Sequence, residues 1–348
     1  MRKCKSTYIY QKIIKTSIVL IAVVICVLCL NNCTEKKNNI DSNDERDNSV
    51  ALYFSEKYYP EYNVFFSANG KGYEIKNENS NKLIIILGGG PVWHSAIGRP
   101  GEKPDGSRFI DLVLPLNIEY NLFIPERFNW EVGLYYLYSV NARERYTVDN
   151  LLINYMEVID EYLLLNDYDF IAVIGSSEGA MIFPELYFNL AEFEKINAFI
   201  SLSYGGLSRF EQYETAYNKI LSKEKPFILP DNEASNVMEE IKLLLSEYRE
   251  EPYPDSTERI DEITERWHSS MMFRRPFDYY KNMEIPILFI HGEMDWNVPV
   301  ESTKYVEVNL PDKPFDFIYY PEMEHRHTVS ELLITLKDMS DWLLKVDP

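Results

Sequence analysis

The stretch Ile171-Ala-Val-Ile-Gly175-Ser-Ser177-Glu-Gly179-Ala180 decides the fold of this chain. Its first four residues are apolar and mostly β-branched, which is typical of a parallel strand buried on both faces. The run ends in Gly-x-Ser-x-Gly and continues into a helix-like segment, 180–190. A strand, tight turn and helix in this order hold the central serine in a strained backbone conformation with its hydroxyl exposed, and the flanking glycines permit close packing.

Two groups of this turn can carry chemistry. The hydroxyl of Ser177 is a candidate nucleophile, and the backbone N–H of Glu178, at the start of the next helix, can donate to a developing oxyanion. Two alternatives stay open. Ser177 can be an ordinary helix N-cap, and the Glu178 side chain can respond only to the positive end of the helix dipole or bind a substrate amine.

The rest of the chain alternates strand-like and helix-like patterns, which predicts an α/β fold with a mostly parallel central sheet flanked by helices. Strands are predicted at 50–54, 63–68, 73–76, 82–87, 120–125, 199–203, 285–290 and 315–320. Amphipathic helices are predicted at 147–165 and 330–346.

The strand pattern stops between 204 and 283, where the sequence is helical and acidic, most clearly at 239–248 and 259–268. We interpret 204–283 as a helical cap inserted over the carboxyl ends of the strands, where ligands bind in open α/β sheets. The alternative is a peripheral helical addition far from any site.

Residues 1–33 have the pattern of a signal peptide. Five basic residues and no acidic one accompany an apolar run over 16–30, which is shorter than the about 20 residues needed to span a membrane. The run ends in Leu30-Asn-Asn-Cys33 and resembles a bacterial lipoprotein signal, with Asn32 where Gly, Ala or Ser is usual. This implies lipidation of Cys33 and an extracytoplasmic, membrane-anchored protein. An uncleaved anchor and a plain secretory signal are the alternatives.

The following stretch, 34–49, is polar and is predicted to be a flexible tether, which leaves 50–348 as the folded domain. All four cysteines lie in the first 33 residues, so the domain has no disulfide, thiol nucleophile or cysteine metal site. The formal net charge of −20 argues against nucleic-acid binding. We interpret the acidity as a solvated surface rather than as an attraction for cationic substrates.

A nucleophilic serine needs a base, and the chain has five histidines. His325 and His327 follow the last predicted strand; we favour His325 as the base and keep His327 as the alternative. His94 is interpreted as a structural or pocket-lining residue, and His268 lies in the insertion. His291 precedes a glycine and is interpreted as a turn residue.

Asp295 is the candidate for the acid that orients the base. It comes shortly after the buried strand predicted at 285–290. The order Ser177, Asp295, His325 is one in which nucleophile, acid and base occur in a known catalytic triad. The alternative is that Asp295 only caps a loop.

Four motifs in this order resemble those of the α/β-hydrolase superfamily, over about 73–342. Gly175-Ser-Ser177-Glu-Gly179 is similar to its nucleophile elbow, and His291-Gly-Glu-Met-Asp295-Trp-Asn-Val-Pro299 is similar to its acid loop. Pro321-Glu-Met-Glu-His325 resembles the loop that carries the catalytic histidine. Gly88-Gly-Gly-Pro91 resembles the His-Gly-Gly-Pro oxyanion loop of proline-iminopeptidase-like members, with glycine in place of the histidine.

The resemblance implies a mechanism in which Ser177 attacks a carbonyl, His325 transfers the proton, and Asp295 fixes the imidazole tautomer. The N–H groups of Glu178 and Gly90 then stabilise the oxyanion, an effect worth roughly 2.7–4 kcal/mol per donor. Another alignment replaces Gly90 by its neighbour Gly89. No metal or organic cofactor is required.

These observations favour a serine hydrolase that cleaves a carboxylic ester or another small acyl substrate through an acyl-enzyme. A serine aminopeptidase or other peptidase of the same fold is the alternative within the enzyme class. A surface binding lipoprotein that keeps the fold without turnover is the alternative outside it. Fold alone does not choose among them.

Overall fold

The computed structural model describes residues 61–67, 70–89, 113–126, 147–224, 226–227, 229–250, 259–260, 263–325 and 329–347. The predicted signal peptide (1–33), tether (34–49) and first strand (50–54) lie outside these ranges. Within them, no helix is long and apolar enough to cross a membrane.

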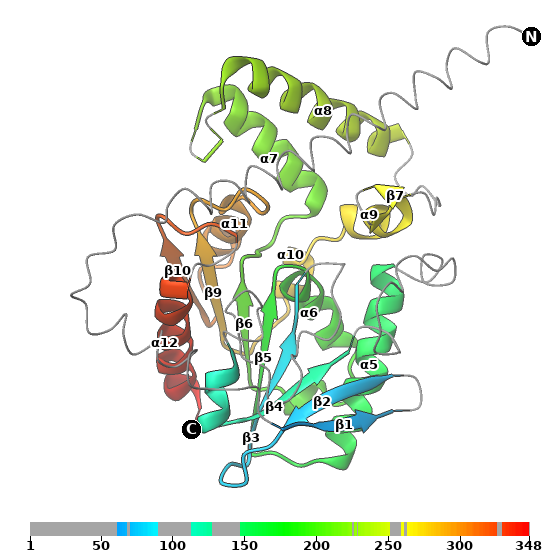
Figure 1. Cartoon of the computed structure of the whole chain (residues 1–348), viewed down its shortest axis with the longest axis vertical. Coiled ribbons are helices and arrows are strands. Elements are labelled where there is room, and N and C mark those ends of the chain that lie inside the picture. Colours follow the sequence, from blue (N-terminus) through cyan, green and yellow to red (C-terminus); the bar gives the residue numbers. More distant parts are fainter. Residues whose placement is uncertain are drawn as a thin grey trace, which may run out of the picture.

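The described part of the chain forms an eight-stranded sheet with the order β1-β2-β4-β3-β5-β6-β9-β10. The two pairs at the β1 edge are antiparallel, and all pairs from β4 to β10 are parallel, as Figure 1 shows. This confirms the predicted α/β class. The strands are β1 (Asn63–Phe66), β2 (Lys71–Ile75), β3 (Lys82–Leu87), β4 (Asn121–Pro125), β5 (Phe170–Ser176), β6 (Ala198–Leu202), β9 (Ile287–Gly292) and β10 (Phe315–Tyr320).

Alternate side chains of the central strands pack on opposite faces of the sheet, as the period of two requires. On one face they pack against α5 (Val148–Leu165), α6 (Glu178–Asn189) and α11 (Glu301–Asn309). On the other face they pack against α12 (Val329–Val346) and the short 3-10 helix η1 (Leu114–Ile118). Both faces are therefore covered, which explains why the strand sequences are almost continuously apolar.

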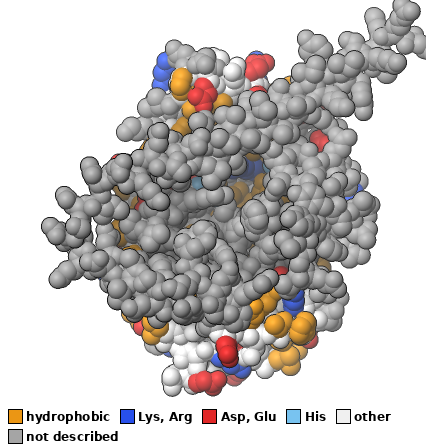
Figure 2. Space-filling model, in the orientation of Figure 1, with side chains coloured by type: hydrophobic (Ala, Val, Ile, Leu, Met, Phe, Trp, Pro, Cys, Tyr) orange, Lys and Arg blue, Asp and Glu red, His pale blue; other side chains and the backbone are white. Residues whose placement is uncertain are grey.

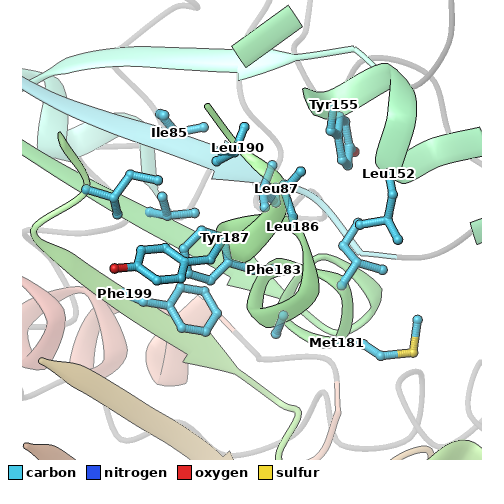
Figure 3. Packing of buried hydrophobic residues seen from close by; sticks show 14 of the residues in the cluster. Ile85, Leu87, Leu152, Tyr155, Met181, Phe183, Leu186, Tyr187, Leu190 and Phe199 are labelled. Carbon is cyan, nitrogen blue, oxygen red and sulfur yellow. The ribbon is translucent and has the colours of Figure 1, made fainter. Parts of the chain in front are cut away.

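Helix α6 anchors the middle of the sheet through aromatic packing. Phe183 lies against Phe199 of β6, with ring centroids 4.1 Å apart. Figure 3 shows these two rings beside Tyr187, in the cluster that also includes Leu87 of β3 and Tyr155 of α5. This packing fixes the start of α6 against the carboxyl ends of β3 and β5, where the Gly-x-Ser-x-Gly turn lies.

The segment 204–283 contains α7 (Arg209–Ser222), α8 (Asp231–Glu250), α9 (Glu265–Met272) and α10 (Phe277–Tyr280), together with a two-stranded sheet of β7 (Arg259–Ile260) and β8 (Ile263–Thr264). The helix predicted at 259–268 is therefore wrong in its first half. Ile260 pairs with Ile263 in an antiparallel hairpin, and isoleucine favours strands because of its β-branch. In Figure 1, α7 and α8 lie beyond the carboxyl ends of the parallel strands.

Candidate active site

The turn between β5 and α6 has the strained geometry that its sequence predicts. Ser177 has φ 50° and ψ −112°, outside the regions that L-residues favour. The surrounding backbone holds it there, since the Ser177 N–H donates to the Leu202 carbonyl over 2.8 Å. A Cβ on Gly175 would lie 2.8 Å from the Ala180 Cα, and one on Gly179 would lie 2.1 Å from the Leu87 carbonyl oxygen. Only glycine therefore fits at these two positions.

The structure brings Ser177, His325 and Asp295 together from three separate parts of the chain. The His325 Nε2 lies 3.1 Å from the Ser177 Oγ, and the His325 Nδ1 lies 2.7 Å from the Asp295 Oδ2. Because a carboxylate only accepts, the Nδ1–H donates to Asp295 and the Nε2 is left to accept the serine proton. Ser177 precedes α6, but its side chain makes no capping hydrogen bond, so the N-cap alternative does not describe its hydroxyl.

Asp295 is buried and fully engaged. Its Oδ1 accepts the backbone N–H groups of Asn297 and Val298, both over 2.8 Å. Burial by itself raises the pKa of Asp295, but the charge of His325 and the hydrogen bonds from His291 and His325 outweigh it, so the pKa is lowered. The carboxylate is thus ionised at neutral pH and can stabilise an imidazolium on His325. A residue that only caps a loop would have no such partner.

His291 is a part of the site that the sequence analysis missed. It lies on strand β9 and is 1% exposed, so its interpretation as a turn residue is wrong: the strand continues through Gly292. The His291 Nε2 lies 2.9 Å from the Val298 carbonyl and 3.3 Å from the Asp295 Oδ2, and the Nδ1 lies 2.7 Å from the Thr303 hydroxyl. The spacing of four residues before Asp295 was the available signal.

The predicted oxyanion donors are only partly described. Glu178 is the first residue of α6, which places its N–H at the positive end of the helix beside Ser177. Gly90 lies outside the described residues, as do His94 and the alternative base His327. The preceding Gly89 is in close contact with the turn, since a Cβ there would lie 2.7 Å from the Ser176 carbonyl oxygen.

The Glu178 side chain contacts the insertion. It is buried, and its Oε1 accepts the indole N–H of Trp267 in α9 over 3.1 Å. This contact uses one of the two carboxylate oxygens, and amine binding by Glu178 stays an untested alternative. Two further contacts join the insertion to the acid loop: Phe227 packs against Trp296 with centroids 5.0 Å apart, and Arg209 donates to the Asn297 carbonyl. The described residues include no group of three or more His, Cys, Asp or Glu side chains that could hold a metal.

The fold is similar to that of known structures, although no family model matches the chain. Pyrococcus horikoshii acylaminoacyl peptidase is 18% identical, with a TM-score of 0.50 over 84% of this chain and 42% of its own. Est1E from Butyrivibrio proteoclasticus, with ferulic acid bound, is 18% identical, with a TM-score of 0.53 over 82% of this chain and 98% of its own. A lipase-esterase related protein from Clostridium acetobutylicum is 16% identical, with a TM-score of 0.50 over 78% of this chain and 98% of its own.

The chain has the α/β-hydrolase fold. In sequence, it is 30% identical over 73 residues to the uncharacterized peptidase YtmA of Bacillus subtilis (strain 168), a match that spans 20% of this chain and 28% of YtmA. The chain thus aligns with less than half of the archaeal peptidase and under a third of YtmA. Within the α/β-hydrolase fold, the described site stands at the carboxyl edge of the parallel strands, between β5, β9 and β10.

Proposed function

We propose that the protein is a serine hydrolase that cleaves a carboxylic ester or a small acyl substrate through an acyl-enzyme. The observation that carries the proposal is the bridge made by His325, whose two ring nitrogens lie within hydrogen-bond distance of Ser177 and Asp295. A nucleophile joined to a base, and a base joined to an orienting acid, are what acyl transfer requires. The esterase and peptidase folds among the similar structures support the same reaction class.

In this mechanism, Ser177 attacks the carbonyl while His325 accepts the hydroxyl proton and later gives it to the leaving group. The N–H groups of Glu178 and, as the sequence predicts, Gly90 stabilise the oxyanion. Water then attacks the acyl-enzyme with His325 again as base, which releases the acid and restores Ser177. The proton balance closes within the triad, and the steps use no further co-reactant.

A peptidase of the same fold is the second candidate, because the sequence match to YtmA and the acylaminoacyl peptidase fold both favour it. Esters and amides share the acyl-enzyme route and differ in the leaving group, which His325 must protonate more completely for an amine. Parallel panels of p-nitrophenyl esters and aminoacyl p-nitroanilides therefore separate the two.

A fluorescent fluorophosphonate tests the proposal directly. We expect the purified protein to be labelled and Ser177→Ala to remain unlabelled. Ser222→Ala, which removes a serine from the exposed end of α7, is the matched control and keeps the label. A folded wild-type protein that takes no label would contradict the proposal and leave the binding-protein alternative.

We also propose that the protein is tethered outside the cytoplasm through a lipid on Cys33. The support is the sequence pattern of 1–33 alone. Metabolic labelling with an alkyne fatty acid should mark the wild type and spare Cys33→Ser. Equal labelling of both would refute lipidation at this residue, and processing without labelling would identify a plain secretory signal.

A further inference from the structure

Arg209 stands at the junction of the insertion and the triad. It is the first residue of α7, which follows β6 through a short loop, and so it lies at the same edge of the sheet as Ser177. Its Nη1 donates to the Asn297 carbonyl in the acid loop and to the Gln212 Oε1 over 3.1 Å. Its Nε is buried without a hydrogen-bond partner among the described residues. The Nε–H is therefore a donor that the described residues leave unused.

No carboxylate of the described residues forms an ion pair with Arg209. The acidic residue two positions later, Glu211, is held by Arg275 at 3.0 Å and by the Ser208 N–H at the start of α7. Asp295 interacts with His325 and His291 through its Oδ2. Burial by itself lowers the pKa of Arg209, but Tyr213, Tyr204 and the charge of Asp295 outweigh it, so the pKa is raised and the guanidinium stays charged. No carboxylate of the described residues nevertheless pairs with it directly, in a chain with a formal net charge of −20.

The surroundings of Arg209 favour an anionic ligand. The ring of Tyr213 covers one face of the guanidinium at 4.7 Å. Because Nη1 already donates to Asn297 and Gln212, the edge that carries Nε is the remaining donor surface. Burial lowers the pKa of His268 in α9 to about 4, with a further contribution from the charge of Arg209. His268 is therefore a neutral hydrogen-bonding group near this cation, and its neighbour Trp267 contacts Glu178 beside the nucleophile.

Figure 2 shows side chains of the Lys or Arg, His and hydrophobic types near the middle of the visible face. A guanidinium edge binds a carboxylate through two parallel hydrogen bonds, which fixes both the position and the orientation of the ligand.

We propose that Arg209 binds a carboxylate group of the substrate, so that the protein prefers acyl compounds that carry a carboxylate close to the scissile carbonyl. This inference rests on the proposed hydrolase function and specifies its substrate class. The carboxylate can belong to the acyl part, as in a monoester of a dicarboxylic acid, or to the leaving group, as in an ester of a hydroxy acid.

Paired esters test both sources. The first pair is mono-p-nitrophenyl glutarate and its methyl-capped diester, and the second is the acetate ester of 4-hydroxybenzoate and that of its methyl ester. For the wild type we expect a higher kcat/KM on the carboxylate member of one pair. Because a hydrogen bond to a charged group contributes a factor of about ten or more, Arg209→Gln should lower this preference at least about tenfold, mainly through KM. Arg209→Lys should keep part of it.

Arg249→Gln is the matched control, because it removes one positive charge from an exposed position in α8 of the same insertion. We expect it to keep the preference. An equal loss on both members of a pair in Arg209→Gln would show that Arg209 only clamps the acid loop, and would overturn the inference. A wild type that favours the neutral member of both pairs would overturn it as well.

The failure of this inference can be told apart from failure of the proposed function. Fluorophosphonate labelling of Ser177 without a carboxylate preference refutes the inference alone. If the protein neither takes the label nor hydrolyses any ester, the proposed function fails, and calorimetric titration with glutarate then decides the inference without turnover. Glutarate binding to the wild type that is weakened at least about tenfold in Arg209→Gln supports carboxylate binding by Arg209. A wild type that does not bind glutarate refutes the inference.

Discussion

Replacing Ser177 by glycine should give a more stable protein than replacing it by alanine. Both variants lose the hydroxyl and its contact with His325, so their difference reports the backbone alone. The residue has φ 50° and ψ −112°, which is the mirror image of an ordinary extended conformation. Glycine adopts this conformation as readily as its counterpart, whereas the Cβ of alanine keeps the clash that serine has.

The expected size follows from two opposing effects. A non-glycine residue in such a region costs on the order of 1–3 kcal/mol, which Ser177→Gly relieves. Glycine also gives the unfolded chain more freedom, which lowers stability by roughly 0.5–1 kcal/mol. The net difference in the free energy of unfolding between the glycine and alanine variants therefore lies between about 0 and 2.5 kcal/mol in favour of glycine, with a central value of about 1 kcal/mol. In a domain of this size, each kcal/mol shifts the Tm by about 2–4 °C.

Urea unfolding followed by circular dichroism, with Tm values from calorimetry, measures this difference. Ser222, at the last position of α7, supplies the control, because glycine there should be less stable than alanine by up to about 1 kcal/mol. An alanine variant of Ser177 that is more stable than the glycine variant, as at Ser222, would refute the argument, since it would show that the turn relaxes and that Ser177 stores no backbone strain.

Three further predictions concern the groups around the triad. His291→Phe should lower kcat/KM about 10- to 100-fold, because it removes a hydrogen-bond donor to the charged Asp295. His291→Gln keeps an N–H near the Nε2 position and should lose less activity. Equal losses in the two variants would contradict a role of His291 in supporting Asp295. Because the pKa of Asp295 lies below its ordinary 3.8, its contribution to stability is present above about pH 5 and is lost as pH falls below that value. The difference in unfolding free energy between wild type and Asp295→Asn should shrink accordingly, and a difference that grows in acid would refute this. Trp267→Phe removes the indole donor to Glu178 and should lower kcat while circular dichroism shows that the variant stays folded. Unchanged kinetics would make this contact dispensable.

Much of the fold could be predicted because its signals are local. The runs at 82–87 and 315–320 have the predicted bounds, and the helix predicted at 147–165 begins one residue later, after the Thr147 cap. Burial on both faces forces a continuous apolar run, and a capping side chain marks a helix start, so each signal is contained in a few consecutive residues. The hairpin at 259–264 was not predicted, because its two isoleucines, three residues apart and next to charged residues, fit a helical pattern equally well.

The site could be predicted only in part, for a different reason. The proximity of Ser177, Asp295 and His325 could be predicted because each follows a strand and stands in a recognisable motif, and their catalytic roles stay a prediction. His291, Trp267 and Arg209 act through partners that are distant in sequence or on another element, so no periodicity reveals them. The contact between Trp267 and Glu178 joins residues 89 positions apart, and only the folded sheet brings them together.

The contacts of the insertion favour a cap over a peripheral addition. The sheet accounts for the meeting of Ser177, Asp295 and His325, since the segments that follow β5, β9 and β10 bring them together at one edge of the sheet. The insertion then touches that triad at two of its supports: Trp267 bonds to the residue after the nucleophile, and Arg209 bonds to the loop that carries the acid. A peripheral helix pair would pack on the outer surface of α5 or α12 and would make neither bond. We therefore infer a division of roles in which the strands fix the chemistry and the insertion, through Arg209, selects the acyl compound that reaches it.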